Sequence, residues 1–566
     1  MRFVLEWVRM KVIRRFSAGG CIAVVLLLAG AVWGAEVPFS RGVNLTGWFQ
    51  ASGPRAIQFT KFTKQDLINI QSLGCDVIRL PINLHAMTSG VPEYTPDPLF
   101  LGFLDQVVDW AEELEIHLIL DNHTFDVDSD TDPNIGEVLR PVWSQMAEHF
   151  KDRSEYLYYE VLNEPHGIDD ATWNSIQTSV IGAIRKVDRK HTIIVGPAGW
   201  NSYNNLDDMS SHRDRNLIYT FHFYDPFLFT HQGATWTNPS MESLAGVPFP
   251  YNADLMPLCP ADLAGSWVEG ALNVSYVREG TVERVKELID IATAFKEDRG
   301  VALFCGEFGV YIPNSDAAER VYWYSIVREY LEEKGIPWTT WDYTGGFGLF
   351  ERDGHDSFEH DLNVPLVEAL GLTAPEQTEF LMAPDTEGFE LYTDYIASGV
   401  QASSYVGNGA LDYYDALNPA DGQYCLSWSG STRYHHIGFD FKPNKDMSVL
   451  VAEGFCLDLW IRGDTSGSAL DIRFMDTDTG SDDHPWRMRV TIAEGGAVWD
   501  GTWQHVQIPL ADFTEHGAWE GSWFNAQGLF DWTAVDRMEI VSEHHDLTGI
   551  TFWFDQIQVL DPSGRR

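Results

Sequence analysis

Cysteine is scarce in this sequence, with six residues among 566. No two of them have the CxxC spacing of a zinc site, so a zinc-stabilised fold is not indicated. Cys75 and Cys305 lie in apolar runs and are expected to be buried thiols. Cys425 and Cys456 could form a disulfide in an oxidising compartment, and the sequence leaves their state open.

Positive charge is also scarce. Lys and Arg number 38 against 83 Asp and Glu, which gives a formal net charge of -45. Such a chain repels the phosphates of nucleic acids, so no nucleic-acid partner is expected. The acidity favours solubility but does not identify a substrate.

Long apolar runs are missing, apart from one near the N-terminus. Cys21–Trp33 is apolar, follows two arginines and precedes Gly34 and Ala35. A basic segment, a short apolar segment and small residues are typical of a secretory signal peptide, here residues 1–35. The run is too short to cross a membrane comfortably. We therefore expect a secreted protein, extracellular or periplasmic, with no membrane span.

Aromatic residues, in contrast, are abundant: 21 Trp, 21 Tyr and 32 Phe. Most must pack in cores, but an excess of Trp also suits a surface that stacks on sugar rings. The length exceeds one compact domain. The sequence pattern divides the chain into a first domain at 36–372, a proline-containing linker at 373–386 and a second domain at 387–562.

The first domain alternates strand-like apolar segments with helical patterns. The strand-like segments are 42–47, 75–81, 116–123, 155–163, 192–196, 216–224, 301–307 and 336–341. The helical segments are 64–73, 100–114, 138–150, 173–189, 281–297, 317–334 and 358–370. Repeated strand–helix units of this number predict an α/β fold, a (β/α)8 TIM barrel.

The second domain has a different pattern. Short strand-like runs such as 424–428, 456–461, 469–474 and 551–559 are separated by turn residues, and helical periodicity is nearly absent. This pattern predicts an all-β sandwich of the jelly-roll type.

Polar and aromatic residues end the predicted strands of the barrel. They are Arg79, His123, Asn163 with Glu164, His222 with Tyr224, Glu307 and Trp341. The carboxyl ends of barrel strands meet at one rim, where ligands bind, so we expect these side chains to share a site. Pro165 favours an extended backbone at Glu164, which we expect to be the last residue of its strand.

Glu164 and Glu307 are the candidate catalytic residues. Glycosidic cleavage needs one carboxylic acid to protonate the leaving oxygen and a second carboxylate to attack or to activate water. Arg79 and Tyr224 are suited to hold an ionised Glu307. The candidates for substrate binding are Arg79, His123, Asn163, His222, Tyr224, Trp341, Trp48, Trp200 and Trp236.

The same rim supports a second hypothesis, a metal hydrolase. Its candidate ligands would be Asp121, His123, His222 and Glu307. No two histidines have the close spacing of metal ligands. The neighbouring Arg79 and Asn163 would disfavour a bound cation. We therefore expect no metal and no other cofactor for catalysis.

The segment Asp225–Thr281 is long for a loop of a barrel. It carries Trp236 and Trp267. It could be a packed excursion with its own small core or a wall of the substrate cleft, and the sequence leaves both open.

Residues 38–372 resemble glycoside hydrolase family 5. The resemblance is carried, in chain order, by Arg79-Leu-Pro81, Asp121-Asn-His123, Asn163-Glu-Pro165, His222-Phe-Tyr224, Gly306-Glu-Phe-Gly309 and Trp341. It implies a retaining mechanism with Glu164 as acid/base, Glu307 as nucleophile and no metal. The family consists mostly of endo-β-1,4-glucanases, with mannanases, xyloglucanases and glycoceramidases among its branches.

The second domain is similar to jelly-roll carbohydrate-binding modules. The closing segment Trp553–Ile557 fits their last strand. Such modules often hold a structural calcium, for which Asp394 or Asp555 could serve. Trp460, Trp486 and Trp503 are candidates for stacking on sugar. Glycan binding and mechanical support of the barrel are both open.

The sequence thus predicts a secreted, monomeric, retaining endo-β-1,4-glucanase acting on a β-glucan polysaccharide or oligosaccharide. The alternatives are a β-mannanase, a xyloglucanase, an endoglycoceramidase and a non-catalytic glycan-binding protein. An endoglycoceramidase would need an apolar groove for lipid, to which Leu255–Leu258 could contribute. A protein that only binds glycan would have no reason to keep both Glu164 and Glu307.

Overall fold

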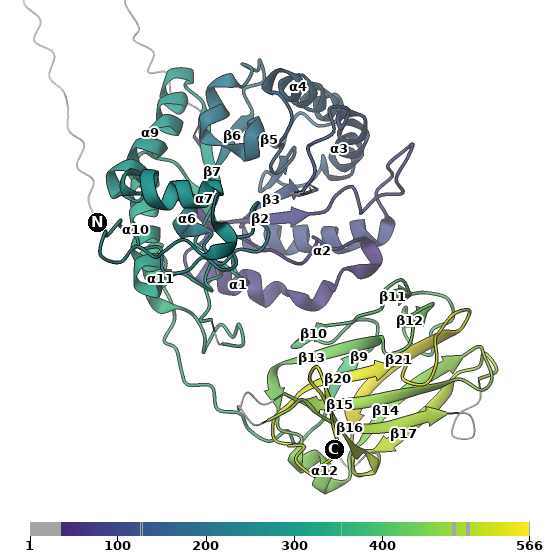
Figure 1. Ribbon diagram of the computed structural model, residues 1–566. Helices are drawn as coiled ribbons and strands as arrows, with labels where there is room; N and C mark the ends of the chain where they lie inside the picture. Colours follow the sequence, from purple (N-terminus) through teal and green to yellow (C-terminus); the bar gives the residue numbers. More distant parts are fainter. Residues whose placement is uncertain are drawn as a thin grey trace, which may run out of the picture.

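The computed structural model describes residues 36–564 except 125, 127, 353, 478–482 and 494–498. The signal peptide expected at 1–35 lies outside the described residues. The chain forms a helix-covered barrel followed by a β-sandwich (Figure 1). No described helix is both long and apolar enough to cross a membrane.

Eight parallel strands close into the barrel in sequence order, with β1 paired to β8. They are β1 (Arg41–Asn44), β2 (Val77–Ile82), β3 (His117–Asn122), β4 (Leu157–Glu160), β5 (Thr192–Val195), β6 (Leu217–Phe223), β7 (Ala302–Phe308) and β8 (Trp338–Thr340). The predicted TIM barrel is therefore confirmed.

Long helices cover most of the barrel. They are α1 (Lys64–Ser72), α2 (Pro98–Leu114), α3 (Gly136–Phe150), α4 (Asp170–Val187), α9 (Val282–Arg299) and α10 (Ala317–Glu333), followed by the short α11 (Val364–Ala369). Between β5 and β6 the connection is shorter and contains only α5 (Ala198–Asn201) and the 3-10 helix η3 (Tyr203–Asp208).

Helix α2 shows how the sequence sets these elements. Asp97 accepts a hydrogen bond from the Leu99 N–H, and Pro98 occupies the first turn, where a missing N–H costs nothing. Its apolar residues recur at helical spacing and face the barrel. At the amino end of the strands, Phe39 packs edge-on against Tyr158 and Phe304 and closes that end of the barrel.

The insertion after β6 contains α6 (Phe227–Thr230), η4 (Ala261–Leu263), α7 (Trp267–Gly270), η5 (Ala271–Ser275) and α8 (Tyr276–Glu279). Leu244, Phe249 and Tyr276 are fully buried, so the insertion has a packed interior. Trp236 and Trp267 remain 41% and 46% exposed. The insertion is therefore a packed excursion that also displays aromatic rings.

Two antiparallel sheets form the predicted sandwich, one of seven strands and one of six, so the fold class is confirmed. Its elements are β9 (Phe389–Tyr392), β10 (Val400–Ala402), β11 (Ala410–Asp415), β12 (Cys425–Ser429), β13 (His436–Lys445), α12 (Ser448–Glu453), β14 (Cys456–Gly463), β15 (Ala469–Asp476), β16 (Trp486–Ala493), β17 (Gln504–Pro509), η6 (Leu510–Asp512), β18 (Thr514–Trp519), β19 (Trp523–Phe524), β20 (Val535–Val541) and β21 (Thr551–Leu560).

The disulfide considered between Cys425 and Cys456 does not form. Both are free thiols, as are the other cysteines in the described part of the chain. β12 and β14 lie on opposite sides of β21, so the two cysteines are separated by a whole strand. Two strand spacings amount to roughly 9–10 Å, beyond the reach of a disulfide.

Candidate active site

Glu164 reaches the rim on a segment that follows β4. The strand itself ends at Glu160, so the expectation that Glu164 is its last residue was wrong. The Asn163 N–H still donates to the Asn122 carbonyl at 2.9 Å, which holds the segment along the end of β3. Glu164 therefore lies beyond the ladder but in a fixed position.

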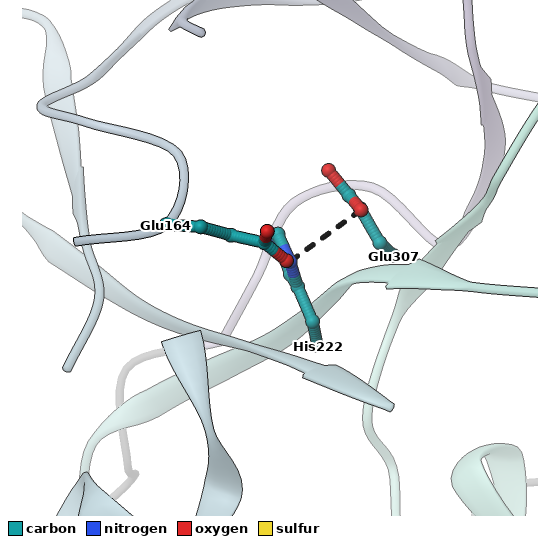
Figure 2. Close-up of side chains that lie close together, drawn as sticks. All are labelled: Glu164, His222 and Glu307. Carbon is teal, nitrogen blue, oxygen red and sulfur yellow. Dashed lines mark hydrogen bonds and ion pairs between the residues drawn. The ribbon is translucent and has the colours of Figure 1, made fainter. Parts of the chain in front are cut away.

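The two candidate carboxylates come together. One oxygen of Glu164 and one of Glu307 lie within 4.8 Å of each other, with His222 between them (Figure 2). His222 Nδ1 is 2.6 Å from Glu164 Oε1 and 3.5 Å from Glu307 Oε2. The segment after β4 and the strands β6 and β7 thus bring these three side chains to one point of the rim, as the sequence predicted.

Glu307 is held by two donors. The Arg79 guanidinium donates through Nη1 to Glu307 Oε1 at 2.7 Å. The Tyr224 hydroxyl donates to Glu307 Oε2 at 2.9 Å. Both bonds stabilise the ionised form of this carboxylate and fix its orientation.

Burial shifts the pKa values of this group in opposite senses for acids and bases. It raises the pKa of Glu164 to about 7. It also raises the pKa of Glu307, and the guanidinium of Arg79, which is bonded to this carboxylate, opposes the effect. Because Arg79 touches Glu307 directly, it favours the ionised form of Glu307. Burial lowers the pKa of His222 to about 4, so this imidazole is neutral near pH 7.

Arg79 is the centre of the buried network. It is fully buried and bonds residues from four other strands or the segments that follow them. Its partners are Asn44 at 2.9 Å, Asp121 at 3.0 Å, Glu160 at 2.8 Å, Asn163 at 2.8 Å and Glu307 at 2.7 Å. One cation therefore serves three buried carboxylates, and burial raises the pKa of each of them.

Replacing Arg79 by alanine is expected to lower the free energy of unfolding by about 3–5 kcal/mol, because Glu160 and Asp121 would stay buried without their cation. Urea unfolding followed by Trp fluorescence at pH 7 measures this loss. Protonation of the stranded carboxylates should shrink the deficit at pH 5. Arg284→Ala, which removes a partly exposed ion pair, should cost less than about 1 kcal/mol. Equal losses in the two variants would contradict this role.

Sequence reasoning missed Asn44 and Glu160. Both side chains are fully buried and bond Arg79. The available signal was a carboxylate inside an apolar strand, since a buried Glu160 needs a cationic partner. The other end of the network is Asp121, which also lies 2.7 Å from His123 Nδ1. This contact orients the His123 ring.

Three predicted sugar ligands face the same space. Asn163 accepts from Arg79, whereas its Nδ2 has no hydrogen-bond partner among the described residues. The His123 and Trp341 rings lie nearly parallel, at 14° and 5.4 Å between centroids. An amide donor and an aromatic face next to Glu164 and Glu307 suit a pyranose ring.

Of the four tryptophans predicted to bind substrate, Trp48 is buried, so the prediction for it was wrong. It is 2% exposed and packs on Phe49 and Phe62, and its indole N–H donates to the Phe59 carbonyl. Its role is to fill the interior of the β1–α1 loop. The sequence pattern could not show that this loop folds back on itself.

Trp200 and Trp236 are exposed, as a sugar platform requires. Trp200 is 43% exposed and stacks on His166 at 3.6 Å. Its backbone has φ of 66°, a conformation that a bulky residue adopts only when its surroundings hold it. Trp236 packs on Phe347, which in turn contacts the Tyr224 ring. The two tryptophans thus come from the loops after β5 and β6.

The ligand set considered for a metal hydrolase is not gathered at one point. Asp121 contacts Arg79 and His123 and is not part of the group formed by Glu164, His222 and Glu307. In the described part of the chain, the three-residue group with metal-like spacing is Glu164, His222 and Glu307. In that group Arg79 already supplies positive charge to Glu307. These contacts fit proton transfer better than metal binding, and catalysis without a metal stays a prediction.

The two aspartates considered for calcium accept backbone N–H groups. Asp394 Oδ1 accepts from Gln423 at 2.6 Å, and Asp555 Oδ2 accepts from Ala420 at 2.8 Å. Donors directed at these oxygens stabilise the turn at 420–423 and disfavour a cation at the same oxygens. A structural calcium stays a prediction that these contacts do not favour.

Known proteins resemble both parts of the chain. The sequence model of cellulase (glycosyl hydrolase family 5) matches residues 36–346, more than half of the chain. The model of carbohydrate binding domain 30 matches residues 400–561. A crystal structure of an endoglucanase from Thermotoga maritima is 25% identical and covers 58% of this chain and 96% of its own, with a TM-score of 0.49.

Several of the similar curated proteins are named endoglucanases. Endoglucanase 3 of Fibrobacter succinogenes is 32% identical over 55% of this chain and 50% of its own length. Endoglucanase C of Acetivibrio thermocellus is 29% identical over 56% of this chain and 95% of its own length. Endoglucanase H of the same organism is 24% identical over 84% of this chain and 49% of its own. The matches with endoglucanases 3 and H thus span about half of those proteins. The chain belongs to glycosyl hydrolase family 5, the cellulases, and carries a carbohydrate binding domain 30 after its barrel.

Proposed function

We propose that the protein is a secreted retaining endo-β-1,4-glucanase. The observation that carries this proposal is the pair Glu164 and Glu307, whose nearest oxygens lie within 4.8 Å. Retaining glycosidases hold their carboxyl groups about 5–5.5 Å apart, whereas inverting enzymes need about 6.5–9.5 Å for a water. The different partners of the two side chains support different roles.

In the first step Glu164, protonated because burial raises its pKa to about 7, gives its proton to the glycosidic oxygen. A carboxylate oxygen of Glu307 forms a bond to the anomeric carbon, and the leaving chain departs with the proton. Arg79 and Tyr224 keep Glu307 ionised and aligned until it attacks.

In the second step a water oxygen attacks the anomeric carbon and displaces the Glu307 carboxylate. Glu164, now ionised, accepts the proton of that water and is ready for another cycle. Two inversions at one carbon give net retention. His222, neutral and 2.6 Å from Glu164, holds the carboxyl group in place through both proton transfers.

The sugar attacked by Glu307 is expected to bind between the Asn163 amide and the face of Trp341. Asn163 Nδ2 is suited to donate to the 2-hydroxyl, a bond that strengthens as the ring becomes oxocarbenium-like. His123 is placed to bond a further hydroxyl beside Trp341. No step of this scheme uses a metal or another cofactor.

β-1,4-Glucan is the proposed substrate because the matching curated proteins are named endoglucanases. Reducing-sugar release by the purified protein should be measured on carboxymethyl cellulose, mixed-linkage glucan, xyloglucan, mannan and a glycosphingolipid. The fastest release is expected from the β-1,4-glucans. Faster release from mannan, xyloglucan or the glycolipid would show that the proposed substrate is wrong. No release from any of the five substrates would refute the proposed enzymatic activity.

The sandwich is proposed to bind glycan, which the match to carbohydrate binding domain 30 supports. Trp486, one of the candidates for stacking, is 1% exposed and belongs to the core. The rings better placed for sugar are Trp519 and Trp523, 54% and 42% exposed at the β18–β19 turn. Secretion and a monomeric state complete the proposal.

Trp236→Ala is expected to raise KM for a long cello-oligosaccharide about tenfold and to leave an aryl β-cellobioside nearly unaffected. The reason is distance: Phe347 separates Trp236 from Tyr224, so Trp236 should meet sugars beyond those at Glu307. Steady-state kinetics on both substrates measures the split. Trp519→Ala, which alters an exposed Trp of the sandwich, is the matched control. Equal effects on both substrates would contradict this position for Trp236.

A further inference from the structure

The β1–α1 loop (residues 45–63) is joined to the sandwich by Gln58. Its Nε2 donates to the Val400 carbonyl at 2.6 Å, and its Oε1 accepts from the Ala402 N–H at 2.9 Å. One side-chain amide therefore bonds a carbonyl and an N–H of β10, an edge strand of the seven-stranded sheet. It pairs with the edge as a neighbouring strand would.

Tyr414 of β11 is a second link. It is 2% exposed, its hydroxyl donates to the Ile57 carbonyl, and it accepts from the Phe59 N–H at 3.2 Å. Arg55 donates to the Tyr414 carbonyl as well. A buried hydroxyl with two partners in another domain belongs to a specific interface, because leaving it unpaired would be costly.

Apolar packing surrounds these bonds. Phe59 stacks on Phe103 of α2 at 4.6 Å, and Tyr395 and Tyr414 of the sandwich contact the same rings. A separate ion pair, Lys442 to Asp356 at 3.5 Å, joins the sandwich to the loop after β8. The sandwich thus touches the loops that follow β1 and β8, both at the rim that carries the active site.

The same loop leads to the catalytic residues. Phe59, which contacts the sandwich, accepts the Trp48 indole N–H inside the loop. At the start of the loop, Thr46 donates to Asp342 at 2.6 Å, next to Trp341. Immediately before it, Asn44 accepts from Arg79, which holds Glu307. These contacts, together with the backbone of the loop that joins them, connect β10 and β11 with the proposed nucleophile.

We propose that the sandwich is a positioning partner of the active site rather than a freely tethered module. By pairing with Gln58 and enclosing Phe59, it fixes the β1–α1 loop, and with it Asn44, Arg79 and Trp341. Hydrolysis of a substrate too small to reach the sandwich then depends on the interface between the domains. The kinetic part of this inference rests on the proposed function, and the assembly part does not.

The test uses the full chain with the double change Gln58→Ala and Tyr414→Phe. The second substitution removes only the hydroxyl and keeps the ring on Phe103, so folding is preserved. Matched controls are Gln65→Ala, on the solvent side of α1, and Tyr434→Phe, on the exposed surface of the sandwich. Kinetics are measured on an aryl β-cellobioside at 25 °C, well below the unfolding transition.

The double variant is expected to lose about tenfold in kcat/KM, mostly in kcat, because small misplacements of catalytic groups are costly. Its Tm should fall by roughly 2–4 °C. The controls should match the unmodified protein in both. A lower Tm with unchanged kcat would overturn the inference, since the interface would then only stabilise the fold. Unchanged Tm and unchanged kinetics would overturn it as well.

A second measurement does not depend on activity. A specific protease site is inserted after Leu381, which is 75% exposed in the linker, and the chain is cleaved there. The two fragments should still co-elute in gel filtration, and the double variant should release them. Separation of the fragments of the otherwise unmodified chain would refute the docking, whatever the outcome of the kinetic test.

Discussion

Glu307→Gln should reduce turnover of any β-glucan by roughly 10⁵-fold, the scale seen when a catalytic nucleophile is removed. Glutamine keeps the size of the side chain and its contact with Tyr224 but cannot form the covalent intermediate. Reducing-sugar release and an aryl β-cellobioside assay both measure the loss. Glu242→Gln, an exposed carboxylate in the insertion, is the control and should leave the rate unchanged.

A variant with a smaller side chain at position 307 distinguishes a nucleophilic role of Glu307 from a structural one. Glu307→Gly leaves a space beside Arg79 that azide can enter, and azide would attack the anomeric carbon in a single displacement. The product should be a glycosyl azide of inverted configuration, detectable by NMR. Activity retained in Glu307→Gln, or a retained azide product from Glu307→Gly, would refute the assignment of Glu307.

Glu164 should control the high-pH side of the rate profile. The first step needs its proton, and burial raises its pKa to about 7. Below this pH the acid is present, and as pH rises through about 7 it is lost, so kcat/KM should fall. Glu307, whose ionised form is stabilised by Arg79 and Tyr224, sets the low-pH side. A pH–rate profile with an aryl β-cellobioside measures both limits.

Glu164→Ala should remove the high-pH limit and lower the rate on glucan by about 10²–10⁴-fold. The loss should be much smaller for a substrate whose leaving group needs no proton, such as a dinitrophenyl glycoside. Azide should now give a product of retained configuration, because it attacks the glycosyl–Glu307 ester. A high-pH limit that persists in Glu164→Ala would assign the titration to another group.

Several features could be predicted because they depend on local pattern. The eight strand–helix units follow from alternating apolar periodicities, and Glu164 and Glu307 follow from strand ends that must converge in a closed barrel. Arg79 and Tyr224 were placed correctly beside Glu307 for the same reason. The end of β4 was misjudged because hydrogen bonding to neighbouring strands, which no single segment reveals, decides where a ladder stops.

The exposure of individual side chains and the pairing of cysteines depended on tertiary contacts. Trp48 and Trp236 are both tryptophans in rim loops, yet one is 2% and the other 41% exposed. The difference in exposure comes only from the path that each loop takes. Likewise Cys425 and Cys456 could not be judged as a pair until β21 was found between their strands.

The sequence by itself determined the two fold classes and the pair of catalytic candidates, because periodicity and strand-end chemistry are local and are repeated along the chain. Its ordered motifs carried the resemblance to the family. Only the tertiary structure decided the roles of Glu160 and Asn44, the burial of Trp48 and the docking of Gln58 and Tyr414 on the opposite domain. Trp48 is buried by the path of its own loop, and the others are contacts between segments far apart in the chain. Such contacts are set by how loops and domains close on one another, and no local pattern encodes that geometry.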